Sequence, residues 1–111
     1  MNIKFPTSIE TQSALQAEYY VISGLSLVQQ YIKGVSFDSD SEMVINGFAL
    51  YEYEDEDLDE VIYMCVEFNY EVDNESFIFG EFIEPGGFDM IDEADEYLRS
   101  LHNVKLIENN F

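Results

Sequence analysis

Positive charge is what this sequence lacks most. It has 4 lysines and arginines against 24 aspartates and glutamates, which gives a formal net charge of −20 over 111 residues. No lysine or arginine lies between Lys33 and Arg99, whereas every acid except Glu10, Glu18 and Glu108 does. Because contacts to phosphate require lysine and arginine, this composition argues against direct binding to nucleic acid or to an anionic membrane.

Other scarce residues exclude further classes of protein. The single cysteine, Cys65, has no internal disulfide partner, which fits a reducing cytoplasm and gives no support to secretion. No apolar run is long enough for a signal peptide or a membrane span. Motifs for a serine nucleophile, a phosphate-binding loop or a zinc site are missing. We therefore expect a cytoplasmic protein without a cofactor or a bound metal.

Apolar residues are abundant despite the charge. The chain is 47% hydrophobic and 15% aromatic, with 9 phenylalanines and 8 tyrosines. Acidic segments that stay disordered are poor in such residues. A chain of this length buries one hydrophobic core rather than two. The sequence therefore predicts one folded domain that spans residues 1–111.

The first third of the chain has a helical pattern. Thr7 and Glu10 have the spacing of a capping box, which marks a helix start. The apolar residues that follow recur at helical spacing: Ala14, Val21, Leu25, Val28 and Ile32. Lys33 and then Gly34 suit a helix end. We predict a helix over Ser8–Lys33, with Gly24 as an unfavourable interior glycine.

The pattern changes after residue 42 and predicts three strands. Met43–Tyr53 is the first, with a bend or bulge at Asn46-Gly47. Val61–Val72 is the second, and Glu75–Ile83 returns from it as the second half of a hairpin. The acidic run Glu54–Glu60 is predicted as a loop, because like charges are unfavourable in a strand ladder.

The second strand alternates clearly. One face is apolar and the other polar: Ile62, Met64, Val66, Phe68, Tyr70 and Val72 against Glu67, Asn69 and Glu71. Pro85-Gly86-Gly87 then interrupts the chain, and a second helix is predicted from Asp89 or Met90 to His102. The tail, Asn103–Phe111, is predicted to add a short strand or to fray.

The predicted fold class is α+β, with elements in the order α-β-β-β-α. A long N-terminal helix packed on one face of a small antiparallel sheet is the economical arrangement. The opposite face of the sheet would then be partly open, and a partner would dock there.

Candidates for catalysis are few. His102 lies near a predicted helix end, where a structural role is more common. Cys65 lies between Met64 and Val66, in an apolar setting that makes a thiol inert. Pairs of carboxylates occur in any chain this acidic, so they do not indicate a glycosidase. We expect no enzymatic activity.

Two short runs resemble the start of a calcium loop. They are Asp38-x-Asp40-x-Glu42 and Asp55-x-Asp57-x-Asp59. Both lack the glycine at the sixth position of the loop, and both lack the glutamate at the twelfth, where Ala49 and Val66 stand. A dedicated calcium site is not expected.

The acids instead indicate a binding surface. An ordinary solubilising surface mixes charges of both signs, and this one has almost no cations. Tyrosines stand among the acids and would anchor an interface whose charges steer association. We predict these partner-binding residues: Glu54, Asp55, Glu56, Asp57, Asp59, Glu60, Glu67, Glu71, Tyr51 and Tyr53. Tyr63, Tyr70 and Tyr97 are further aromatic candidates.

Three segments carry a resemblance to a known family: EDEDLDEVIYMCVEF, ESFIFGEF and FDMIDEADEYLRS. With them the chain resembles bacterial toxin-immunity proteins, and most of all the immunity proteins of contact-dependent growth inhibition systems that neutralise ribonuclease toxins. The resemblance implies a 1:1 complex with a cognate basic toxin domain in the same cytoplasm. It also implies that the bound protein blocks the active site or substrate groove of the toxin, and it implies no catalytic residues.

Two alternatives stay open. One is a DNA mimic that occupies the groove of a nucleic-acid-binding protein. The other, from a different class, is a small acid-based enzyme or a metal-binding protein. A toxin-domain gene immediately upstream would favour the immunity protein over the DNA mimic.

Overall fold

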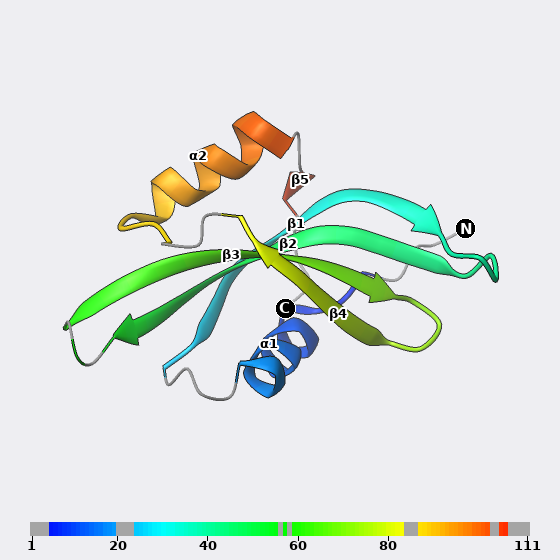
Figure 1. The fold of residues 1–111 in the computed structure, drawn as a ribbon, viewed down its shortest axis with the longest axis horizontal. Coiled ribbons are helices and arrows are strands. Elements are labelled where there is room, and N and C mark those ends of the chain that lie inside the picture. The colour runs from blue at the N-terminus through cyan, green and yellow to red at the C-terminus, as the bar shows by residue number, and fades with distance from the viewer. Residues whose placement is uncertain are drawn as a thin grey trace.

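Two helices lie on opposite faces of an antiparallel sheet (Figure 1). The computed structural model describes residues 5–19, 24–55, 57, 59–83, 87–102 and 105–106. Its elements, in chain order, are α1 (Ser8–Glu18), β1 (Ser26–Phe37), β2 (Met43–Asp55), β3 (Glu60–Glu71), β4 (Ser76–Phe82), α2 (Ile91–His102) and β5 (Lys105–Leu106). The strands form one sheet in the order β4-β3-β2-β1-β5. The predicted α+β class is confirmed.

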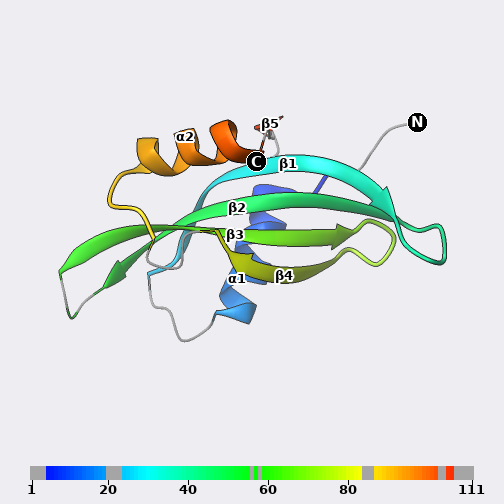
Figure 2. The same cartoon turned by 45° about the horizontal axis from the view of Figure 1, so that its top comes forward.

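Each helix covers its own hydrophobic cluster. Leu15 of α1 packs on one face of the sheet with Ala49, Phe68 and their neighbours. Ala94 and Leu98 of α2 pack on the other face. Both views place α2 over the half of the sheet nearer the β2–β3 hairpin (Figures 1 and 2). The rest of that face, toward the β1–β2 and β3–β4 turns, has no helix over it among the residues described.

Strand β3 shows how the two faces differ. The alternation predicted for Val61–Val72 is confirmed, because Met64, Val66 and the apolar positions after them lie in the cluster under α1. The opposite face changes character along the strand. Cys65 is buried under α2, whereas the positions that follow on this face are polar and half-buried: Glu67, Asn69 and Glu71.

The capping box is confirmed at the start of α1. The Glu10 N–H donates to Thr7 Oγ1 at 3.1 Å, and the Thr7 N–H donates to Glu10 Oε1 at 3.4 Å. The predicted length of this helix is wrong, however, because α1 ends at Glu18 instead of Lys33. Gly24, predicted as a helix interior residue, has φ of +71°, which is a left-handed conformation outside any α-helix.

The second half of the predicted helix is strand β1. It pairs with β2 from Ser26↔Glu52 to Phe37↔Met43, and without it the β2 edge would lack partners for its N–H and C=O groups. The apolar residues have helical spacing because β1 buries side chains on both faces of the sheet. Leu27 and Ile32 pack on the α1 side, while Val28 and Tyr31 pack on the α2 side.

The other boundaries shift less. The predicted loop Glu54–Glu60 is shorter than expected, since Asp55 pairs with Glu60 and the ladder includes both acids. The predicted strands Val61–Val72 and Glu75–Ile83 are close to β3 and β4, and the second predicted helix is close to α2. From the tail, Lys105–Leu106 pairs with β1 as a short strand. The remainder of Asn103–Phe111 lies outside the described residues.

A β-bulge sits where the sequence predicts one, at Asn46-Gly47, but the extra residue is on the neighbouring strand. Ile32 pairs with Gly47 and Gly34 pairs with Asn46, so Lys33 is the bulged residue of β1. A Cβ atom on Gly47 would lie 2.3 Å from the Tyr31 carbonyl oxygen and 2.9 Å from Phe68 Cζ. Gly47 is therefore required for the close approach of β1 to β2.

The two glycines beside the bulge, Gly34 and Gly47, give a direct test of this strand pairing. Gly47→Ala should destabilise the fold by about 3 kcal/mol, because the new methyl group overlaps backbone. Gly34→Ala is the matched control, since a Cβ at Gly34 meets no atom within 4 Å, and its effect should stay within about 1 kcal/mol. Urea unfolding measures both. Equal effects for the two variants would contradict the β1–β2 register.

Candidate protein-binding surface

The structure divides the predicted binding residues between two distant places. Glu54, Asp57, Asp59 and Glu60 lie at the β2–β3 hairpin and are exposed; we call them the hairpin acids. Glu67 and Glu71 lie toward the other end of β3, and at about 3.3 Å per residue roughly 36 Å of strand separates Glu60 from Glu71. The longest dimension of the molecule is 45 Å. The predicted residues therefore do not form one cluster.

Two predicted acids fall outside this description. Glu56 and the side chain of Asp55 are not among the residues that the structure describes.

The tyrosines are less available than predicted. Tyr51, predicted to contact a partner, has 0% of its surface exposed and belongs to the core under α1, as does Tyr70. The prediction for Tyr51 is wrong because both faces of β2 are packed at this point, and Tyr51 faces the cluster under α1 together with Ala49. Tyr53, Tyr63 and Tyr97 are half-buried. Of the five predicted tyrosines, these three keep some exposed surface.

The uncovered half of the α2 face carries a polar surface, which we call the open sheet surface: Lys33, Gly34, Asn46, Glu67 and Asn69. Together with Val35 these residues line a hollow of about 480 Å³. Lys33 Nζ lies 4.0 Å from Glu67 Oε2, and both side chains are about half exposed. Because the bulge adds Lys33 to β1, it sets the direction in which the lysine side chain leaves the strand.

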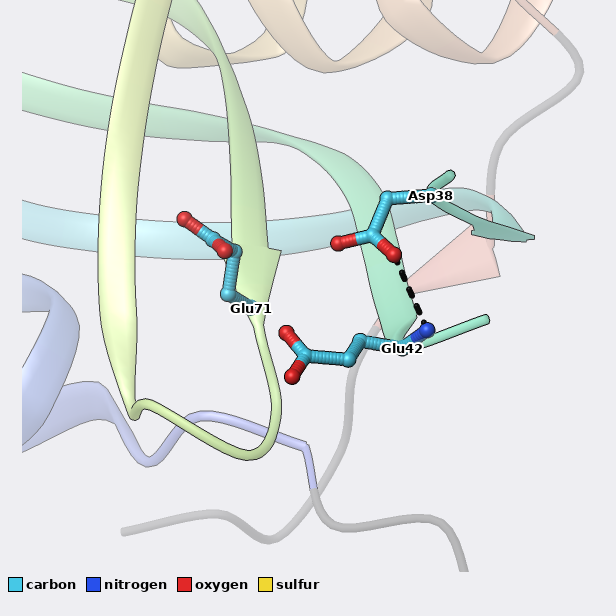
Figure 3. A group of neighbouring side chains, drawn as sticks. All are labelled: Asp38, Glu42 and Glu71. Atoms are coloured by element: carbon cyan, nitrogen blue, oxygen red, sulfur yellow. Dashed lines mark hydrogen bonds between the residues drawn. The ribbon is translucent and has the colours of Figure 1, made fainter. Parts of the chain in front are cut away.

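Three carboxylates stand at the end of this surface and form the carboxylate cluster: Asp38, Glu42 and Glu71 (Figure 3). One oxygen from each lies within 4.8 Å of the others. The side chain of Asp38 accepts hydrogen bonds from the backbone N–H groups of Asp40 and Glu42, at 2.9 and 3.0 Å. These bonds shape the β1–β2 turn and bring its acids beside Glu71 of β3.

The carboxylate cluster has like charges close together. The negative charge of Asp38 raises the pKa of Glu42, and burial, Asp73, Asp40 and Glu71 add to this in decreasing order. Neither of the cations with described ion pairs neutralises the carboxylate cluster, since Lys33 pairs with Glu67 and Arg99 pairs with Asp95. The repulsion between these carboxylates therefore lowers the stability of the folded state.

The two calcium-like runs now have a structural explanation. The residues that would complete each twelve-residue loop belong to strands, because β2 begins at Met43 and β3 begins at Glu60. Carboxylate oxygens spaced as in the carboxylate cluster are of the kind that hard cations bind. Exposed acids with this spacing are also common without an ion.

Cys65 has no reactive thiol. It is fully buried under α2, and burial raises the pKa of its thiol to about 12. Such a group stays protonated at neutral pH and is a poor nucleophile. The side chain of His102, and with it a pair between Cys65 and His102, lies outside the described residues.

Comparisons with protein families, curated proteins and solved structures found no match to this chain. Neither α1 nor α2 has the length and apolar character that crossing a membrane requires, within the residues described.

Several residues of this surface escaped the sequence analysis. The sequence pattern predicts a helix that ends at Lys33, with Gly34 directly after it, and it indicates no place on a sheet for the acids of the polar link that follows, Asp38 and Glu42. The signal that would have placed them is Gly34 followed by the β-branched Val35, which is a poor continuation of a helix and a good one for a strand. Once β1 is a strand, its turn to β2 brings these acids to the sheet.

Thiol reactivity tests the burial of Cys65. In the native protein a thiol reagent such as a disulfide-exchange dye should modify Cys65 only as fast as the protein unfolds, since the sulfur has no exposed surface. The same reagent should react at once in denaturant. Fast modification of the native protein would contradict the packing of α2 on the sheet.

The carboxylate cluster predicts a stabilising substitution. A glutamate whose pKa is raised by folding contributes stability below its ordinary value of 4.5, and loses that contribution as the pH rises through the raised value. Glu42→Gln should therefore raise the urea midpoint at pH 7, and this gain should disappear as the pH falls below 4.5.

Glu81→Gln serves as the control, because it removes one charge from an exposed position of β4 outside the carboxylate cluster. An equal gain from both variants would show that only total charge matters.

Proposed function

We propose that this protein is an inhibitor that binds a strongly basic protein domain in a 1:1 complex, most simply a nuclease toxin that it neutralises in the manner of an immunity protein. One observation carries the proposal. The open sheet surface ends in a carboxylate cluster over which neither described helix lies, and its like charges raise the pKa of Glu42. A cationic partner surface would relieve that repulsion.

The chemistry of nucleases fits such a partner. A nuclease needs a cationic groove to hold the phosphates of its substrate. A surface that presents carboxylates at close spacing offers the same charge to that groove and competes with the substrate. The chain would then need no catalytic residue of its own.

The hairpin acids have a supporting role in this proposal. They lie at the far end of a molecule 45 Å long, beyond the reach of the same pocket on a small partner. Exposed charges of this kind attract a basic partner as it diffuses toward the protein. Salt screens this attraction beyond about 8 Å at physiological ionic strength. Fast capture suits an inhibitor whose target is harmful while it is free.

A DNA mimic is the second candidate. Acids at both ends of an elongated body would suit a long groove that normally holds a duplex. The same charge chemistry serves both candidates. The partner distinguishes them: a toxin domain encoded by the adjacent gene supports the immunity protein, and a partner that binds duplex DNA supports the mimic.

Two triple variants test which end of the molecule contacts the partner. The sheet-end variant combines Asp40→Lys, Asp73→Lys and Glu71→Gln. The hairpin variant combines Glu54→Lys, Asp57→Lys and Asp59→Asn, where asparagine is used because Asp59 has φ of 54°, a conformation that asparagine tolerates. Both variants change the net charge by the same amount.

Binding to the product of the adjacent gene is then measured by association and dissociation kinetics across a salt series. The sheet-end variant should slow association and speed dissociation, with a loss of affinity of about tenfold or more, because it changes charges inside the interface. The hairpin variant should slow association alone, and its effect should disappear at high salt.

Two outcomes would contradict the proposal. Equal losses from the two variants would mean that total charge, and not the open sheet surface, determines binding. Unchanged kinetics in both folded variants would mean that the acids only solubilise the protein.

A further inference from the structure

We propose that the hollow in the open sheet surface is a pocket for an arginine side chain of the basic partner. This inference rests on the proposed function and names the group by which the partner is held. The hollow measures about 480 Å³ and is lined by Lys33, Gly34, Val35, Asn46, Glu67 and Asn69. A guanidinium group fits in a space of this size.

The fold builds this hollow with two features of β1. The bulge at Lys33 bends the strand where it passes Asn46 and Gly47. The next residue, Gly34, leaves the floor open, because a Cβ there would meet no atom within 4 Å. Any larger side chain at this position would project into the hollow.

Oxygen acceptors face this space from two neighbouring strands. Glu67 Oε2 lies 4.0 Å from Lys33 Nζ, beyond hydrogen-bond distance, so the carboxylate keeps capacity for further donors. Asn46 uses its Nδ2 to donate to Ser36 Oγ at 3.1 Å, which leaves its carbonyl oxygen as an acceptor. Asn69 adds a second carboxamide.

Arginine fits this set better than lysine or a metal ion. Its planar guanidinium carries five N–H donors, enough to reach a carboxylate and two amide oxygens at once. An ammonium group is a compact point charge and is already present as Lys33. A divalent cation would prefer several carboxylates, and the hollow itself offers one, Glu67.

The surrounding charges favour a second cation despite Lys33. The carboxylate cluster begins two residues beyond Asn69, at Glu71 on the same face of β3, and places three acids beyond this end of the hollow. Among the described residues, Lys33 forms its ion pair with one carboxylate, Glu67. An arginine that enters the hollow would replace Lys33 as the ion-pair partner of Glu67 and displace the lysine side chain toward solvent.

Small capped amino acids test the pocket on the free protein. N-acetyl-arginine amide is titrated into isotope-labelled protein and compared with N-acetyl-lysine amide, with detection of the Gly34 backbone amide and the Asn46 and Asn69 side-chain amides by NMR. We expect saturable shifts at these three positions, with arginine binding about tenfold more tightly than lysine.

Four variants should change the affinity for the arginine probe in different ways. Gly34→Leu fills the hollow and should abolish the saturable shifts, and Glu67→Gln should weaken binding about tenfold. Lys33→Met removes the competing cation and should tighten binding, an effect that a purely structural role for Lys33 would not produce. Glu81→Gln should leave binding unchanged. The amide spectrum and urea midpoint of each variant establish that it is folded.

Three results would overturn the pocket: equal affinity for the two probes, shifts spread over the acidic surface without saturation, or full binding by folded Gly34→Leu. This test uses no partner, so its failure differs from failure of the proposed function. If the pocket fails while the partner binds with the expected dependence on the sheet-end acids, the partner uses the carboxylate cluster alone. If the pocket binds arginine but no partner binds, only the proposed function fails.

Discussion

The antiparallel pairing of β1 with β2 is the constraint on which the rest of the structure depends. It places Tyr31 beneath α2, inserts the bulge at Lys33, and turns the chain so that Asp38 and Glu42 meet Glu71 of β3. The close approach over Gly47 leaves no room for a side chain there. The surface for which we propose a function is therefore a consequence of one strand pairing, and it would not exist had residues 26–37 formed a helix.

A single hydrogen bond helps to decide how much of the sheet stays open. The Tyr31 hydroxyl donates to Asp95 Oδ1 at 2.5 Å, and Arg99 Nε lies 3.0 Å from the same carboxylate. Burial, followed by the bond to Asp95, raises the pKa of Tyr31 far above its ordinary value, so the hydroxyl remains a donor. This contact joins α2 to β1 and keeps the helix over the apolar positions of the sheet. The part of this sheet face that α2 does not cover can be polar.

Part of this fold could be predicted from the sequence. Elements with one buried face were predicted correctly, whereas a strand that buries both faces was not. The capping box at Thr7 and the alternation of β3 depend on local spacing, and both were predicted correctly. Strand β1 buries Leu27 on one side and Val28 on the other, which imitates the spacing of a helix. The acids beside Tyr51 in the sequence indicate a surface residue, although its face of β2 lies in the core.

The division of the acids into two groups was beyond sequence reasoning for a different reason. Along the chain, Glu60 and Glu71 belong to one acidic stretch, but the length of β3 puts them at opposite ends of the molecule. Asp38 is far from Glu71 in sequence, yet the registers of two strand pairs bring their carboxylates within 4.8 Å. A shift of a single residue in either register would turn alternate side chains to the other face and remove the carboxylate cluster. Charge density is therefore a property of composition, whereas the crowding that makes a binding surface is a property of register.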